Sequence, residues 1–183
     1  MERKINAIIS MCIVVLFLIH GISGGFVLFG MTDGGGPVLH VLTVIMAVLI
    51  IIHAVIGIQL TVATIRKIRR SGTMYMKGNR LFWARRISGF AVMIFLVFHL
   101  ALFAVSSGGA YRLKVFDGAN LIFALLLAVS LGTHVLTNIK PFAISVGASR
   151  VREYIKDILF VLSIVMIFCA AAFIIYFIRW NFV

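Results

Sequence analysis

Long apolar runs separated by short polar connections make up most of the chain. Five of them are uncharged over most of their length and long enough to cross a hydrocarbon core, which takes about 20 helical residues. They fall near residues 5–30, 37–65, 81–106, 119–141 and 157–179. Because a single segment in lipid must satisfy its own backbone hydrogen bonds, each run is predicted to be a helix. The pattern therefore predicts an all-α, polytopic membrane protein, with residues 1–183 forming one bundle of five transmembrane helices.

The composition agrees with a membrane location. Of the 183 residues, 63% are hydrophobic and 12% are charged, whereas soluble domains average roughly 45–50% apolar residues. A soluble core cannot hide that much apolar surface, so the soluble classes are excluded. The net charge of +12 would suggest nucleic acid in a soluble protein. Here it indicates topology and contact with anionic lipid head groups, and no nucleic-acid partner is expected.

The distribution of cations predicts the orientation. Fourteen of the seventeen Lys and Arg fall at the N-terminus, around the second connection or in the fourth connection. The other side carries only Arg112, Lys114 and Arg179. The positive-inside rule then places the N-terminus in the cytoplasm and the C-terminus outside. The first apolar run exceeds the roughly 7–15 residue core of a signal peptide, so we expect it to be part of the mature structure.

Four of the five histidines lie inside apolar runs, one on each of the first four: His20, His53, His99 and His134. An imidazole at that depth destabilises the protein unless it has a partner. Counting about 1.5 Å per residue from each span's midpoint, two histidines lie toward the outside and two toward the cytoplasm. The outer pair is His20 with His99, and the inner pair is His53 with His134.

Two pairs at two depths are what a pair of stacked haems requires. A low-spin haem takes one axial nitrogen from each side of the ring, supplied by facing helices. We therefore predict that the outer and inner pairs each ligate one haem b. A single intramembrane histidine often serves only as an interhelical hydrogen-bond partner, and that alternative stays open for each residue. Neither Cys12 nor Cys169 lies in a C-x-x-C-H motif, so covalent haem attachment is not supported.

Other residues near the histidines fit the same hypothesis. At the cytoplasmic mouth, Arg85 and Arg86 are expected to pair with the anionic propionates of the inner haem, and Ser88 to add a hydrogen bond. Small residues close to the histidines are expected to make room for the macrocycle. These are Gly21, Gly24, Gly25, Gly57 and Gly132.

The motifs around the histidines resemble those of a known family. Arg86-Ile87-Ser88-Gly89, followed ten residues later by His99, resembles the R-x-[ST]-G…H pattern of succinate dehydrogenase and fumarate reductase cytochrome b subunits. His53-Ala54-Val55-Ile56-Gly57 resembles the H-A-x-x-G segment in the second span of that family. The likeness covers the whole chain and is greatest to the single-subunit, five-span, di-haem type that works with menaquinone.

The resemblance implies a membrane anchor for an FAD-containing flavoprotein and an iron–sulfur subunit, both docked on the cytoplasmic face of a bacterial inner membrane. It implies electron transfer between the iron–sulfur subunit and a membrane quinone through two haems b. His20 and His99 would hold the distal haem, and His53 and His134 the proximal one. Dicarboxylate chemistry would belong to the flavoprotein, because this chain has no nucleophile–base constellation.

The quinone site and the function class leave alternatives open. Quinone chemistry moves protons, so an ionisable group near the quinone is expected. Asp33 in the outer Gly-rich turn, with His40 nearby, is one candidate site, and the region of Arg85 and Ser88 is the other. The chain is alternatively a cytochrome b of a hydrogenase or formate dehydrogenase, or a small membrane protein without redox function.

Overall fold

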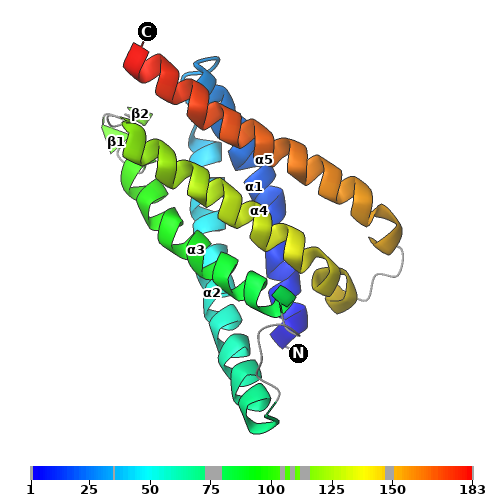
Figure 1. Ribbon diagram of the computed structural model, residues 1–183. Coiled ribbons are helices and arrows are strands. Elements are labelled where there is room, and N and C mark those ends of the chain that lie inside the picture. The colour runs from blue at the N-terminus through cyan, green and yellow to red at the C-terminus, as the bar shows by residue number, and fades with distance from the viewer. Residues whose placement is uncertain are drawn as a thin grey trace.

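The computed structural model describes residues 2–34, 36–72, 80–103, 106–107, 110–111, 116–146 and 151–182. Five long helices make up nearly all of it (Figure 1). They are α1 (Glu2–Phe29), α2 (Pro37–Arg70), α3 (Arg80–Phe103), α4 (Gly118–Val146) and α5 (Val151–Phe182). Each is long and apolar enough to cross a membrane. The prediction of an all-α bundle of five transmembrane helices is confirmed.

A short hairpin joins α3 to α4. Strand β1 (Ser106–Ser107) pairs antiparallel with β2 (Ala110–Tyr111), with Ser106 opposite Tyr111 and Ser107 opposite Ala110. The sequence analysis did not predict these strands. Lys77, Arg112, Lys114 and Arg150, which entered the count of cations, lie outside the described residues.

The helix ends follow local chemistry. α1 closes in a Schellman motif, in which the Gly30 N–H donates to the Val27 carbonyl (2.9 Å) and the Met31 N–H to the Phe26 carbonyl (3.0 Å). Gly30 has a φ of 73°, a left-handed conformation that glycine adopts without steric cost. α2 starts with Pro37 in its first turn, where a missing N–H leaves no hydrogen bond unmade.

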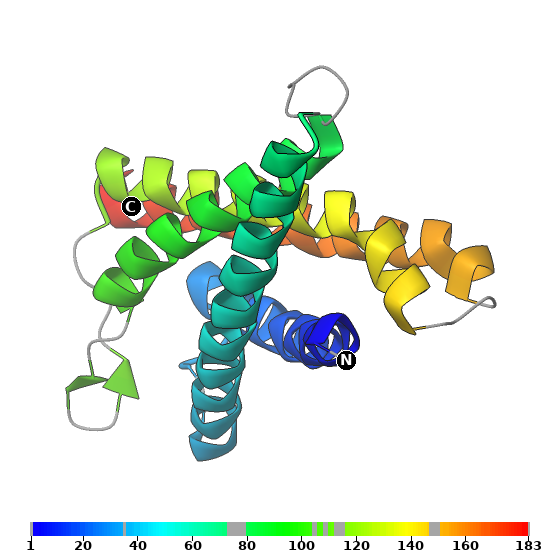
Figure 2. The same cartoon turned by 90° about the horizontal axis from the view of Figure 1, so that it is seen from below.

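The two termini lie at opposite ends of the bundle, as five crossings require (Figure 1). α4 and α5 run side by side and cross α2 at a steep angle, which Figures 1 and 2 both show. Extensive packing joins α3 to α4, α1 to α2, α1 to α5 and α4 to α5. Within the described residues, packing is not extensive between α1 and α3 or between α2 and α4.

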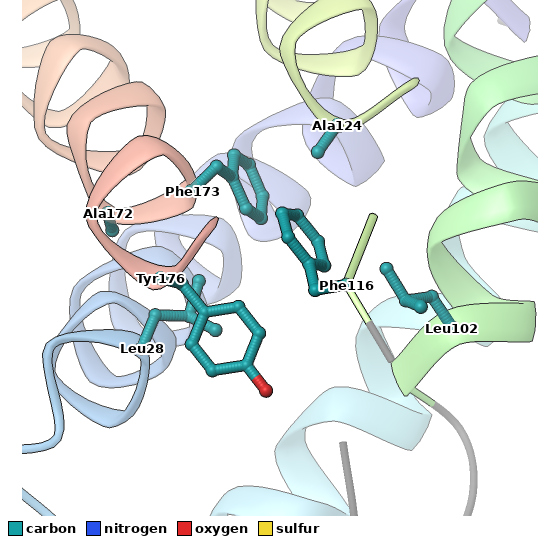
Figure 3. Close-up of a cluster of buried hydrophobic side chains, with 7 residues drawn as sticks. All are labelled: Leu28, Leu102, Phe116, Ala124, Ala172, Phe173 and Tyr176. Carbon is teal, nitrogen blue, oxygen red and sulfur yellow. The ribbon is translucent and has the colours of Figure 1, made fainter. Parts of the chain in front are cut away.

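Figure 3 shows one cluster of buried apolar side chains contributed by several helices. They come from α1, α3, α4 and α5 and from the segment that precedes α4: Leu28, Leu102, Phe116, Ala124, Ala172, Phe173 and Tyr176. The outward faces of the helices are apolar as well; Val97 is 64% exposed and Ile167 is 70% exposed. Apolar side chains exposed to water would cost free energy, whereas the same side chains facing lipid do not.

Candidate functional site

The structure brings the four intramembrane histidines together in two pairs. The ring centres of His20 and His99 are 6.3 Å apart with an interplanar angle of 75°. Those of His53 and His134 are also 6.3 Å apart, at 83°. The first pair links α1 to α3 and the second links α2 to α4. Each pair therefore spans two helices that have little other contact.

The separation of the rings suits a shared metal ion. An imidazole nitrogen binds a transition metal at about 2 Å, and the ring centre lies roughly 1.2 Å behind that nitrogen. Two imidazoles on opposite sides of one ion would therefore have ring centres about 6.4 Å apart, close to the 6.3 Å of both pairs. Direct edge-to-face contact between rings also falls in the range of about 4.5–7 Å, so the hydrogen bonds of the nitrogens must decide between the two.

In the inner pair, hydrogen bonds fix which nitrogen of each ring carries the proton. The His134 Nδ1 lies 3.2 Å from the backbone carbonyl of Arg85, which can only accept, so Nδ1 is the protonated nitrogen. The His53 Nδ1 lies 3.2 Å from the Ser10 hydroxyl, which already donates its one proton to the Asn6 carbonyl (2.7 Å). His53 therefore also donates from Nδ1.

The same logic applies to His20 in the outer pair. Its Nδ1 lies 3.2 Å from the Thr43 hydroxyl, and that hydroxyl donates to the Leu39 carbonyl (2.8 Å). The rings of His20, His53 and His134 therefore donate their Nδ1–H to a neighbouring helix. The Nε2 of each ring keeps a lone pair that can accept. His53 and His134 cannot hydrogen-bond to each other through two acceptors. Two facing lone pairs are the donors that a metal ion between the rings would need.

The hydroxyl partners are crossed between α1 and α2. Ser10 of α1 holds His53 of α2, and Thr43 of α2 holds His20 of α1. On each helix the hydroxyl precedes the histidine by ten residues, a rise of about 15 Å. The two pairs therefore form two layers roughly 15 Å apart along the helices. The sequence analysis missed Ser10 and Thr43, although the repeated Ser/Thr-x9-His spacing could have revealed them.

The inner pair lies against a close contact of α3 and α4. A Cβ placed on Gly89 would lie 3.0 Å from the His134 Cε1 and 3.2 Å from its Nδ1, so an added methyl would push the ring back by a few tenths of an ångström. The Ser88 hydroxyl lies 3.4 Å from the same Nδ1, and Ser88 is buried. Ser88 thus lies beside His134 itself, while its predicted role toward a propionate stays a prediction.

The two arginines at this end differ in their contacts. The Arg85 Nε donates to the backbone carbonyl of Thr137 (2.8 Å), one turn beyond His134, and so ties α3 to α4. The Arg86 guanidinium lies 5.2 Å from the centre of the Phe82 ring. Its Nε is buried and has no hydrogen-bond partner in the described part of the chain. A buried donor of this kind is satisfied by an anion, which makes Arg86 the better candidate for a propionate.

The glycines divide into two groups. Gly21 and Gly25 face α5, where added Cβ atoms would meet Cys169 and Phe168, so they serve helix packing. The expectation that these two make room for a macrocycle is corrected. Gly24 and Gly57, each four residues after an outer or inner histidine, would place a Cβ with no atom within 4 Å. Gly132 has Met166 as its nearest neighbour, at 3.8 Å.

The predicted quinone residues Asp33 and His40 lie at the surface, outside both histidine pairs. Asp33 is in the turn after α1 and His40 is in the first turn of α2, and both side chains are exposed. The His40 N–H donates to the Gly36 carbonyl (3.2 Å). Their part in quinone binding stays a prediction.

Neither a group of three or more metal-ligating side chains in the described part of the chain nor a similar known protein adds to the description of the site. Within the described residues, no three His, Cys, Asp or Glu side chains converge, and an iron porphyrin needs only two axial ligands from the protein. Comparison of the chain with family models, with curated proteins and with solved structures gives no match.

Proposed function

We propose that this chain is the di-haem cytochrome b anchor of a succinate dehydrogenase or fumarate reductase complex in a bacterial inner membrane. In this role it passes electrons between an iron–sulfur subunit and a membrane quinone, menaquinone. The observation that carries the proposal is the pairing of imidazoles at 6.3 Å in two layers. The outward hydrogen bonds of Nδ1 support it, because they leave Nε2 free to act as a ligand.

The residues of the chain have separate tasks in this proposal. Bound haem b supplies one-electron redox chemistry. His20 with His99, and His53 with His134, would each hold one haem iron. Arg86 offers a buried donor for an acidic group beside the inner pair. The apolar cluster that includes Phe173, which packs on His99, would limit the access of water to the outer pair.

The spacing of the layers suits electron transfer along the bundle. The two layers lie about 15 Å apart measured along α1 or α2, so the sites lie one above the other and not side by side. The basic N-terminal end, taken as cytoplasmic from the distribution of cations, is where the flavoprotein and the iron–sulfur subunit would dock. The quinone would approach the outer layer near Asp33 and His40, or the inner layer near Arg85 and Ser88.

A reduced-minus-oxidised spectrum of the purified full-length chain tests the proposal. We expect b-type bands and two haems per chain. His53→Ala should remove one centre and leave the His20–His99 centre, while His20→Ala should do the reverse. His40→Ala is the matched control, because His40 lies outside both pairs, and it should keep both haems. A colourless wild-type chain would refute the proposal.

Partners separate this proposal from the other di-haem anchors. A complex purified from native membranes should contain a flavin-bearing subunit that oxidises succinate or reduces fumarate. Purification with a hydrogenase or formate dehydrogenase subunit instead would assign the chain to one of those complexes. Both results keep the two haem centres and change only the partner.

A further inference from the structure

Tyr176 on α5 carries a buried hydroxyl that the described residues do not satisfy. Only 7% of the residue's surface is exposed. Its hydroxyl oxygen is inaccessible and has no hydrogen-bond partner in the described part of the chain. The ring packs edge-on against Phe116, with ring centres 5.2 Å apart. In Figure 3 the oxygen points away from both Phe116 and Phe173.

The surroundings of the ring do not explain the hydroxyl. Its neighbours in the cluster are apolar, and phenylalanine would fill the same space without burying a polar group (Figure 3). A buried hydroxyl without a partner costs free energy relative to that alternative. Because a phenol is protonated at neutral pH, it is available as a hydrogen-bond donor. The described residues thus leave this donor without an acceptor, which a bound ligand would supply.

The position of Tyr176 identifies the chemistry of that acceptor. Phe173 lies edge-on to His99 of the outer pair, with ring centres 6.3 Å apart. Tyr176 follows Phe173 by three residues, which is about one helical turn toward the C-terminal end. Arg179 follows one turn later, and its guanidinium donates to the Leu28 carbonyl (3.0 Å). A phenol donor with a cation one turn beyond it favours an oxygen that is carbonyl-like or negatively charged.

We infer that the Tyr176 hydroxyl donates a hydrogen bond to a carbonyl or carboxylate oxygen of a ligand bound beside the outer pair. Two ligands of the proposed function present such an oxygen: a quinone through its carbonyl, and haem through a propionate. The inference rests on the proposed function and adds a contact residue on α5, the one helix without a histidine. It places that contact in the buried interior, whereas Asp33 and His40 are exposed.

The test compares Tyr176→Phe with Tyr154→Phe in the purified full-length chain. Tyr154 lies near the other end of α5 and is 59% exposed, so its variant is a matched control. Two quantities are measured: the affinity for menadione, a simple naphthoquinone, and the midpoint potential of each haem centre. If the ligand is a quinone, Tyr176→Phe weakens menadione binding about 5- to 10-fold, the value of one hydrogen bond. Both potentials then stay unchanged.

If the ligand is the haem carboxylate, a different result follows. Losing the donor leaves more negative charge near the outer iron and favours its oxidised form. The potential of the centre that His20→Ala abolishes then falls, while menadione affinity stays unchanged. Either result supports the inference and names the ligand.

Two results would overturn the inference, and a third would separate it from the proposed function. Tyr176→Phe matching Tyr154→Phe in both measurements overturns the inference. So does a lower melting temperature of the ligand-free Tyr176→Phe chain, because that would reveal a partner within the protein. A colourless chain that binds menadione more weakly after Tyr176→Phe refutes the haem function and keeps the inference.

Discussion

Removing either of the two crossed hydroxyls should weaken one proposed haem centre and spare the other. The crossing of the contacts decides which centre is weakened. Ser10→Ala removes the hydroxyl acceptor for the Nδ1–H of His53, which also bonds to the Asn6 backbone, and Thr43→Val removes the hydroxyl acceptor for that of His20. Ser10 is on the helix of the outer histidine, yet it serves the inner one. We therefore expect Ser10→Ala to affect the inner centre and Thr43→Val the outer centre.

The size of the effect follows from the hydrogen bonds. Loss of a partner behind a metal-bound histidine weakens metal binding by about 10- to 100-fold, which is about 1.4–2.7 kcal/mol. Both contacts are 3.2 Å long, at the weak end of the N–H···O range of about 2.7–3.2 Å. The effect should therefore lie near tenfold for each centre. Neither hydroxyl touches His134, whose Nδ1–H donates to a backbone carbonyl that no side-chain substitution removes.

Haem retention measures this effect. The purified variants are mixed with a haem-scavenging protein, and the loss of each centre is followed by its band in a redox titration. Thr61→Val and Ser163→Ala are the controls, because these hydroxyls donate to carbonyls of their own helices, as Thr43 and Ser10 also do. The crossed assignment is wrong if Ser10→Ala weakens the outer centre, or if it weakens both centres equally.

Three further substitutions follow from the geometry. Gly89→Ala should displace His134 and weaken haem binding at the inner centre about tenfold. The helix should not lose stability, because alanine is about 1 kcal/mol more favourable than glycine in a helix. Unchanged haem retention would contradict the close contact. Gly30→Ala should lower the free energy of unfolding in detergent by about 1–2 kcal/mol, because φ is left-handed, and it should also displace Arg179; an unchanged melting temperature would contradict this. Asp33→Asn should slow quinone turnover with both haems retained, and normal turnover would refute an outer quinone site at that residue.

The transmembrane architecture could be predicted from the sequence because lipid leaves few alternatives. Runs of about 20 apolar residues must be helices there, and the five spans are confirmed. The constant rise of a helix also converted residue numbers into depths. The structure places His20 beside His99 and His53 beside His134, while their role as iron ligands stays a prediction.

Contacts that depend on helix rotation could not be predicted in the same way. Depth says nothing about which face a residue occupies, so Gly21 and Gly25 were expected beside a macrocycle although they pack on α5. The same limit hid the contact of Arg85 with the Thr137 carbonyl. Hydropathy likewise could not show that Tyr176 is buried with an unsatisfied hydroxyl.

The division of the histidines between the two helical hairpins has a consequence for biogenesis. The hairpin of α1 and α2 contributes one imidazole to each layer, and the hairpin of α3 and α4 contributes the other. During synthesis the outer layer can close only after α3 has entered the membrane, and the inner layer only after α4 has followed it. A chain released from the ribosome after α2 would carry two half-sites and no complete one. If haem binds between the paired histidines as proposed, its capture follows the insertion of both hairpins and joins them late in assembly.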